Sequence, residues 1–192
     1  MEDLIHMFNV LSEEVEVNGV KHQSIITHSP ITELETRYIH TLTNIEQGSL
    51  IKYKDVNYLT VTESIAGRYG KFKAKIEHCN HFLKFKGEII KELIVDKNGK
   101  PILDIYGDEQ YRDVESEPTL LPSIVRENSF SISGQQLLIA NNQIVIVVQH
   151  TTKADQLIKV NVELTLFNVT WKIVNVNKIR NGLLICTCDK KI

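Results

Sequence analysis

Three residues that could bind a metal, or act as a nucleophile and its base, lie within four positions of the sequence. They are His78, Cys79 and His81, in the stretch KIEHCNHFLKF, and two further thiols, Cys186 and Cys188, lie near the C-terminal end. Structural zinc sites need two pairs of ligands with a regular short spacing, which HCNH and CTC do not supply. On an extended strand only Cys79 and His81 would share a face. We therefore expect no metal and no cofactor.

Catalysis by these residues is also not expected. The base and orienting group of a nucleophilic cysteine are usually distant in sequence, so a cysteine beside a histidine is a weak signal. Paired acids in GDEQYRDVESE, residues 107–117, could hold Mg²⁺ in a nuclease, but charge runs are normally solvated loop surface. The sequence lacks a Gly-rich phosphate loop and a serine elbow. We expect a protein that is not an enzyme, with reduced and buried cysteines.

A series of lysines is the best local candidate for a binding surface. Lys71, Lys73 and Lys75 alternate with other residues, so on a strand they share one face, and Lys84 and Lys86 continue the pattern on the next strand. This surface could face an acidic partner or DNA. Alternatively, it is a solvated sheet face that lysines keep soluble.

Strand patterns fill most of the chain after residue 15. The segments are rich in Val, Ile, Thr, Tyr and Phe, and turn signals such as NG at position 18 and RNG at 180–182 separate them. Helical spacing is confined to residues 2–14 and to part of 108–128. The expected strands are 24–28, 36–42, 49–54, 58–65, 70–79, 81–87, 88–96, 143–150, 159–167, 170–179 and 182–188. The sequence predicts a mainly β fold.

Two stretches of the chain echo each other without a gap. DVNYLTVT, residues 55–62, and NVTWKIVN, residues 168–175, each have a polar turn residue, a valine, and an aromatic residue at the start of a strand. The echo indicates either a duplicated hairpin or two hairpins that are merely alike. We expect the aromatic and later valine positions to form the cores of the barrels, with the aromatic rings as interface anchors in the alternative. These positions are Tyr58, Val61, Trp171 and Val174.

The long segment between these stretches sets the expected domain boundaries. Residues 101–135 hold three of the four prolines and an acidic run, and so long a loop is uncommon inside a compact domain. We expect two small β-barrel-like modules joined by a long linker, with a short N-terminal helix or arm. The expected divisions are an N-terminal arm or extension over 1–45, a first β module over 46–100, a linker or projecting segment over 101–140, and a second β module over 141–192.

Charge and hydropathy exclude some partners. The formal net charge is −2 and the pI is about 6.4, so no global basic field is available to hold a nucleic-acid backbone. No apolar run is long enough for a signal peptide or a membrane span, so we expect synthesis in a cytoplasm and no membrane contact.

Two long segments resemble structural proteins of tailed bacteriophages and prophages of Gram-positive hosts. The first is QGSLIKYKDVNYLTVTESIAGRYGKFKAKIEHCNHFLKF, from residue 47, with its Tyr-Leu-x-Val strand and its Cys-Asn-x-x-Leu-Lys-aromatic ending. The second, from residue 142, contains the Val-Val-Gln strand and ends in an Asn-Gly-Leu-Leu hairpin. The first 45 residues match only loosely.

The resemblance implies a virion structural protein of the head-tail interface. Such a connector or stopper subunit forms a homo-oligomeric ring, contacts portal or adaptor and tail proteins, and surrounds genomic DNA without binding it specifically. It is assembled in the host cytoplasm and is found in the virion. The alternative is a tail, baseplate or nucleic-acid-associated binding module with a small-barrel fold.

Overall fold

The computed structural model describes residues 6, 8, 10–28, 35–67, 70–127 and 142–191. The chain divides into two compact units. We call Met1–Leu83 together with Leu121–Ile192 the body, and Lys84–Leu120 the hairpin unit. None of the helical segments among the described residues has the length and hydropathy of a membrane span.

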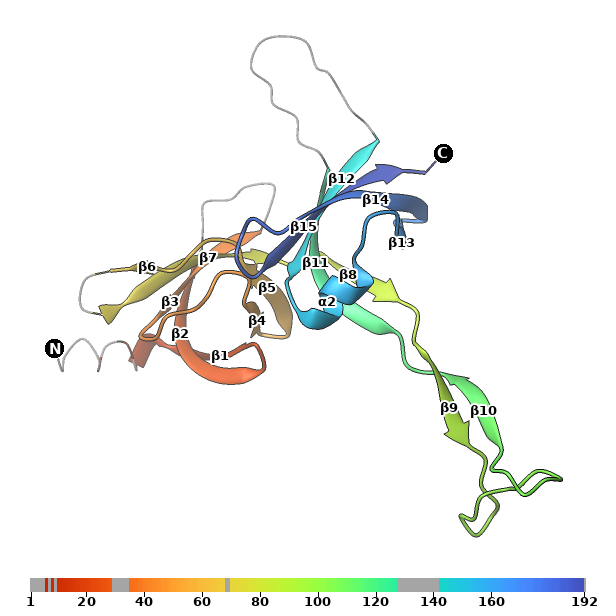
Figure 1. The fold of residues 1–192 in the computed structure, drawn as a ribbon. Coiled ribbons are helices and arrows are strands. Elements are labelled where there is room, and N and C mark those ends of the chain that lie inside the picture. Colours follow the sequence, from red (N-terminus) through yellow and green to blue (C-terminus); the bar gives the residue numbers. More distant parts are fainter. Residues whose placement is uncertain are drawn as a thin grey trace. The chain divides into compact units, whose positions relative to one another are not determined.

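The first half of the body is a closed antiparallel barrel (Figure 1). Its sheet runs in the order β3-β2-β1-β4-β5-β7, and β7 pairs back onto β3 to close it, while the two-residue strand β6 pairs with β7. The strands are β1 (Glu13–Val17), β2 (Val20–His28), β3 (Thr36–Thr41), β4 (Leu50–Tyr53), β5 (Val56–Thr60), β6 (Ile65–Ala66) and β7 (Phe72–His78). Closure removes the exposed edges that an open sheet would present.

Alternation of inward and outward residues builds the core of this barrel. Val15, Ile39, Ile51 and Tyr58 are buried in one apolar cluster. The NG dipeptide joins β1 to β2 as a tight turn in which both residues have positive φ. That conformation suits Asn and Gly, and it fits the right-handed twist of the strands.

The second half of the body is a nearly closed, barrel-like sheet. Its order is β13-β14-β15-β12-β11-β8, and the short helix α2 (Thr152–Leu157) lies between β12 and β13 in the chain. The rings of Phe167, at the end of β13, and His81, at the start of β8, lie 5.1 Å apart, so the two edge strands approach each other there. The strands are β8 (His81–Phe85), β11 (Thr119–Glu127), β12 (Gln143–Gln149), β13 (Glu163–Leu166), β14 (Val169–Asn177) and β15 (Leu183–Lys190).

The two echoing stretches begin in the same kind of turn, one in each sheet. Lys54 and Asp55 join β4 to β5 with φ of 48° and 63°. Phe167 and Asn168 join β13 to β14 with φ of 53° and 61°. Two residues with positive φ between paired strands define the hairpin turn that matches strand twist. The echo therefore marks an equivalent hairpin in each half of the body.

The four aromatic and valine positions of the echo have different environments. Tyr58 and Trp171 are buried, at 1% and 9% exposure. Val61 is half-buried and packs against a cluster that lies between the two sheets. Val174, expected in a core, is 38% exposed, because the pairing of β14 with β15 shifts register between Ile173 and Asn175. A bulge of this kind turns the extra side chain outward.

The expected divisions of the chain differ from the elements observed. Of the range 1–45, strands β1, β2 and β3 belong to the first barrel, and the helical residues His6, Phe8, Val10 and Leu11 precede them. The range 46–100 ends beyond that barrel, since β8 joins the second sheet and β9 (Ile89–Leu93) lies in the hairpin unit. The range 101–140 contains β10 (Tyr111–Glu115) and β11, where helical spacing was expected, while 128–140 lies outside the described residues.

The hairpin unit is a two-stranded antiparallel ribbon of β9 and β10 that ends in two small turns (Figure 1). Three backbone hydrogen bonds form a ring here. The amide of Ile94 donates to the carbonyl of Gln110 at 2.9 Å, that of Ile102 to Ile94 at 2.8 Å, and that of Gln110 to Ile102 at 3.0 Å. The three residues are eight positions apart. They hold the bases of the two turns together.

Candidate functional site: the inter-barrel joint and the exposed surfaces

The stretch KIEHCNHFLKF is the passage from the first barrel to the second sheet, since β7 ends at His78 and β8 begins at His81. The three side chains considered for metal binding or catalysis have different neighbours. His78 lies 3.6 Å from a carboxylate oxygen of Glu35, Cys79 is buried in an apolar cluster, and His81 packs on Phe167. Among the described residues no group of three His, Cys, Asp or Glu side chains could hold a metal ion.

Cys79 belongs to an apolar cluster with members from both halves of the body. Leu59 comes from β5 of the first barrel, and Ile124, Val147 and Leu183 come from strands of the second sheet. Burial raises the pKa of the Cys79 thiol to about 12, and the charge of Glu77 adds to this effect. The thiol is therefore protonated at neutral pH and is a poor nucleophile. Its role is packing between the two halves of the body, a region that we call the joint.

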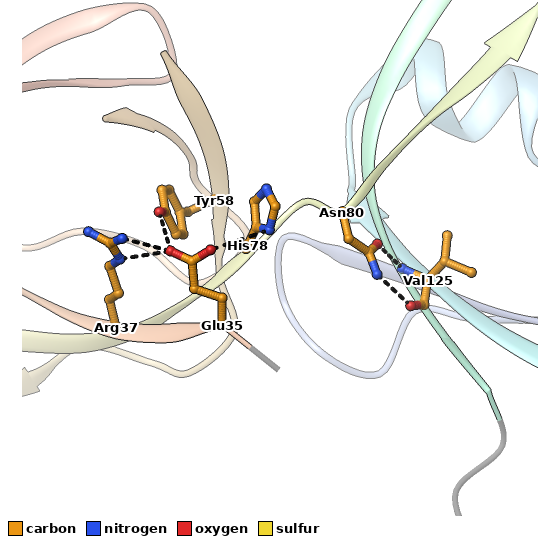
Figure 2. A network of polar contacts seen from close by, with 6 residues as sticks. All are labelled: Glu35, Arg37, Tyr58, His78, Asn80 and Val125. Carbon is orange, nitrogen blue, oxygen red and sulfur yellow. Dashed lines mark hydrogen bonds and ion pairs between the residues drawn. The ribbon is translucent and has the colours of Figure 1, made fainter. Parts of the chain in front are cut away.

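Two polar contacts flank this cluster. The Asn80 side chain donates to the carbonyl of Val125 at 2.9 Å and accepts from the Val125 amide at 2.8 Å, so its amide group pairs with β11 as a strand backbone would (Figure 2). Next to it, Arg126 of β11 donates through Nε and Nη2 to the carboxylate of Glu77, a residue of β7 that is only 2% exposed. A buried carboxylate needs such a partner.

Two glycines bring the backbones of the two halves into direct contact. A Cβ on Gly48 would lie 1.9 Å from the carbonyl oxygen of Gly182, and a Cβ on Gly182 would lie 2.0 Å from that of Gln47. Both glycines also have positive φ. Only glycine meets both requirements. The joint is therefore a close-packed interface rather than a flexible linker.

A network of polar contacts around Glu35 connects it to Arg37, Tyr58 and His78 in the first barrel (Figure 2). One carboxylate oxygen of Glu35 accepts from the Tyr58 hydroxyl at 2.8 Å and from two nitrogens of Arg37. The Tyr58 hydrogen bond lowers the pKa of Glu35 most, with Arg37 assisting against the cost of burial. Burial, followed by the Glu35 contact, raises the pKa of Tyr58 to about 12. The group thus combines a carboxylate with a protonated phenol.

The lysines that the sequence singled out fall into the two units. Lys71 precedes β7, and Lys73 and Lys75 lie on it, alternating with the buried Ala74 and Ile76. Lys84 and Lys86 are both exposed and belong to the hairpin unit. The structure therefore groups the first three lysines on the outer side of one strand.

The outer side of β7 carries lysine side chains and exposed apolar surface together. Lys73 stands in a cross-strand row between His40 of β3 and Ile65 of β6, and Ile65 is 71% exposed. Burial lowers the pKa of His40, and the charges of Lys73 and Lys71 lower it further. The ammonium of Lys73 also lies 4.1 Å from the ring centre of Tyr38. We call Tyr38, His40, Ile65, Lys71, Lys73 and Lys75 the β7 face.

Exposed apolar side chains are abundant in the hairpin unit, a feature that the sequence reading missed. Ile105 and Tyr106 have the highest exposures, 91% and 84%. The other large apolar residues exposed there are Ile89, Ile90, Val95, Ile102, Leu103, Tyr111 and Leu120. Monomeric proteins rarely leave so much apolar surface in one small region unless another molecule covers it. The sequence signal was an eight-residue repeat, VDKNGKPI followed by LDIYGDEQ.

The acidic run at 107–117 forms no paired-carboxylate site. Glu109 accepts a hydrogen bond from the Tyr111 hydroxyl at 2.7 Å, and Arg112 within the run forms an ion pair with Glu92. The run forms one side of the exposed ribbon.

Comparison with protein families divides the chain between the two sheets of the body. Residues 1–78 match the model described as the YomX N-terminal domain, and residues 73–189 match the YomX C-terminal domain. The two matches overlap over residues 73–78, within β7, after which the chain leaves the first barrel. No curated protein and no solved structure matches the chain.

Proposed function

Because this chain belongs to the YomX family, a protein family of phage or prophage origin, we propose that it is a virion structural subunit of a tailed phage. In this proposal it forms a ring at the head-tail interface, joins the portal side to the tail, and surrounds the DNA channel as a connector or stopper. Its work is assembly and mechanical support, without catalytic turnover.

The observation that carries the proposal is the combination of a stiff body with an exposed apolar hairpin unit. The two halves of the body share an apolar cluster, an ion pair with a buried carboxylate and a backbone contact between glycines. Such a body can transmit load between neighbours without bending at the joint. The hairpin unit presents Ile105 and Tyr106, which gain nothing by facing water. A subunit of a ring needs both parts, a rigid block and a contact that reaches its neighbour.

The charge of the chain is compatible with a channel wall. A ring around moving DNA should not hold phosphates, because every lysine or arginine contact adds affinity that opposes passage. The formal net charge of −2 meets this requirement for the subunit as a whole.

Deletion of the coding sequence from the phage or prophage genome tests the proposal. We expect DNA-filled heads and separate tails in electron micrographs of the lysate, with joined particles restored when the wild-type chain is supplied in trans. Normal joined and infectious particles without the chain would contradict it.

The lysines of the β7 face favour a second candidate, a tail- or baseplate-associated module that binds nucleic acid. Three lysines beside an aromatic ring are a common arrangement for contact with single strands. Fluorescence anisotropy with a single-stranded oligonucleotide distinguishes the two. Binding that weakens with salt and is lost in Lys71→Glu/Lys73→Glu would favour this candidate, whereas the ring proposal predicts no binding at moderate salt.

A further inference from the structure

Two sister turns at the end of the hairpin unit have the same architecture but opposite chemistry. In the polar turn, Asp96–Gly99, the Asp96 carboxylate accepts from the amides of residues 98 and 100 at 2.7 and 3.0 Å. In the apolar turn, Asp104–Gly107, the Asp104 carboxylate accepts from the amides of residues 106 and 108 at 2.8 and 2.9 Å. Both turns end in a glycine with positive φ.

The residues at the centre of each turn are therefore not dictated by the fold. Lys97 and Asn98 occupy the polar turn, and Ile105 and Tyr106 occupy the equivalent positions of the apolar turn. Turn centres favour polar residues, and the polar turn forms with them. The apolar pair at 91% and 84% exposure thus has no structural role in the turn itself. These two exposed apolar side chains, Ile105 and Tyr106, are suited to contact with a partner, and we call them the knob.

Charge divides the chain in a way that identifies the partner. The hairpin unit, residues 84–120, carries nine acidic and six basic residues, a formal net charge of −3, whereas the whole chain carries −2. The remaining residues therefore carry +1. Acids surround the knob directly, since Asp104, Asp108 and Glu109 are within four positions of it. Nucleic acid and anionic lipid would both be repelled by this stretch.

The β7 face of the body has the complementary character. It offers the positive charges of Lys71, Lys73 and Lys75 beside the exposed side chain of Ile65 and the ring of Tyr38. An apolar centre with acids around it matches an apolar and aromatic surface with lysines around it. Complementary potentials of this kind set both the choice of partner and its orientation.

We propose that the apolar turn of one copy docks on the β7 face of a second copy of this chain. This inference deepens the proposed ring function and rests on it. Since the two surfaces differ, the contact is head-to-tail, and repetition closes a ring when the rotation between copies allows it. One such contact is smaller than a standard interface and is weak alone, whereas ring closure engages two per subunit and strengthens assembly.

Sedimentation velocity across a wide range of protein concentration tests the contact. The variant Ile105→Lys/Tyr106→Asn gives the apolar turn the residues of its sister, so the turn is expected to fold unchanged. We expect self-association of the wild type that weakens with salt, and a dissociation constant about tenfold or more higher in this variant. Lys71→Glu/Lys73→Glu should have a similar effect. Lys153→Glu/Lys159→Glu, with the same change in net charge elsewhere on the body, should have little effect.

Disulfide trapping locates the contact between copies. The three native cysteines are buried, so each variant with one added cysteine has one accessible thiol. A mixture of Tyr106→Cys and Lys73→Cys chains is expected to form a mixed dimer much faster than a mixture of Asn98→Cys and Lys73→Cys. Because the thiols belong to different chains, docking of the hairpin on its own body cannot give this product.

The outcomes separate the contact from the ring function. A wild type that associates while both interface variants associate equally well overturns this contact and leaves the ring proposal standing. A wild type that stays monomeric and gives no trapped dimer also overturns the contact, while the deletion experiment tests the virion role independently. Loss of oligonucleotide binding in the lysine variant, with association unchanged, would instead assign the β7 face to nucleic acid.

Discussion

Glu77 of the first barrel is buried against Arg126 of the second sheet, with two hydrogen bonds from the guanidinium to the carboxylate. The carboxylate is 2% exposed and the Arg126 side chain 39% exposed. This ion pair links β7, which closes the first barrel, to β11, which follows the hairpin unit in the chain. It ties together segments that are 49 residues apart in the sequence.

Removal of Arg126 alone should destabilise the protein strongly. Arg126→Met leaves the Glu77 carboxylate buried without a partner, and we expect the free energy of unfolding to fall by about 3 kcal/mol in urea denaturation. Arg112→Met removes an exposed ion pair with Glu92 and should cost under about 1 kcal/mol. Glu77→Leu/Arg126→Met should recover most of the loss, because no buried charge remains. Equal losses in the two arginine variants would show that the joint does not depend on this pair.

Alanine at Gly48 should separate the two halves of the body. The added methyl would meet the Gly182 carbonyl and also strain a residue with φ of +81°, so we expect a loss of about 3 kcal/mol or more. Gly19→Ala is a matched control, because Gly19 has the same φ and nothing within 4 Å of its Cβ position, and it should cost about 1 kcal/mol.

Labelling of Cys79 with a thiol reagent reports the same change locally. Cys79 lies in the cluster between the two halves, so opening of the joint exposes it. We expect its labelling in the native protein to accelerate in Gly48→Ala and to stay slow in Gly19→Ala. Slow labelling in both variants would contradict a role for the glycine contact in closing the joint.

Alkaline pH should weaken the contribution of Tyr58. Its pKa is raised from 10.0 to about 12, first by burial and then by the hydrogen bond to Glu35. The folded state therefore keeps a proton that the unfolded state loses above pH 10, so stability from this group is full below pH 10 and is lost as the pH rises towards 12. The difference in unfolding free energy between the wild type and Tyr58→Phe should shrink over that interval. A constant difference would contradict the buried, protonated phenol.

Local patterns in the sequence were sufficient to predict much of the fold. The NG turn, the strand alternation around Lys73 and Lys75, and the matching hairpins that begin at Asp55 and Asn168 all depend on neighbours in the chain. The mainly β, two-barrel architecture follows from such signals. They also placed Tyr58 and Trp171 at equivalent positions, where both side chains are buried.

Features that depend on distant segments could not be predicted in this way. The joint needs Asn80 against Val125 and Gly48 against Gly182, and no local pattern records such pairs. Helical spacing within 108–128 was misleading because β10 and β11 follow each other there, and their apolar residues fall at mixed intervals. Val174 faces outward because of a bulge that the alternation does not reveal.

Electron cryo-microscopy of the assembled phage particle tests the central claim most directly. The account predicts a ring of copies of this chain between the portal and the tail, with Ile105 and Tyr106 of each copy against Lys71, Lys73 and Ile65 of the next. A particle that lacks the chain, or that holds it outside the head-tail interface, would contradict the proposed function. A ring in which the apolar turn faces solvent would contradict the contact between copies.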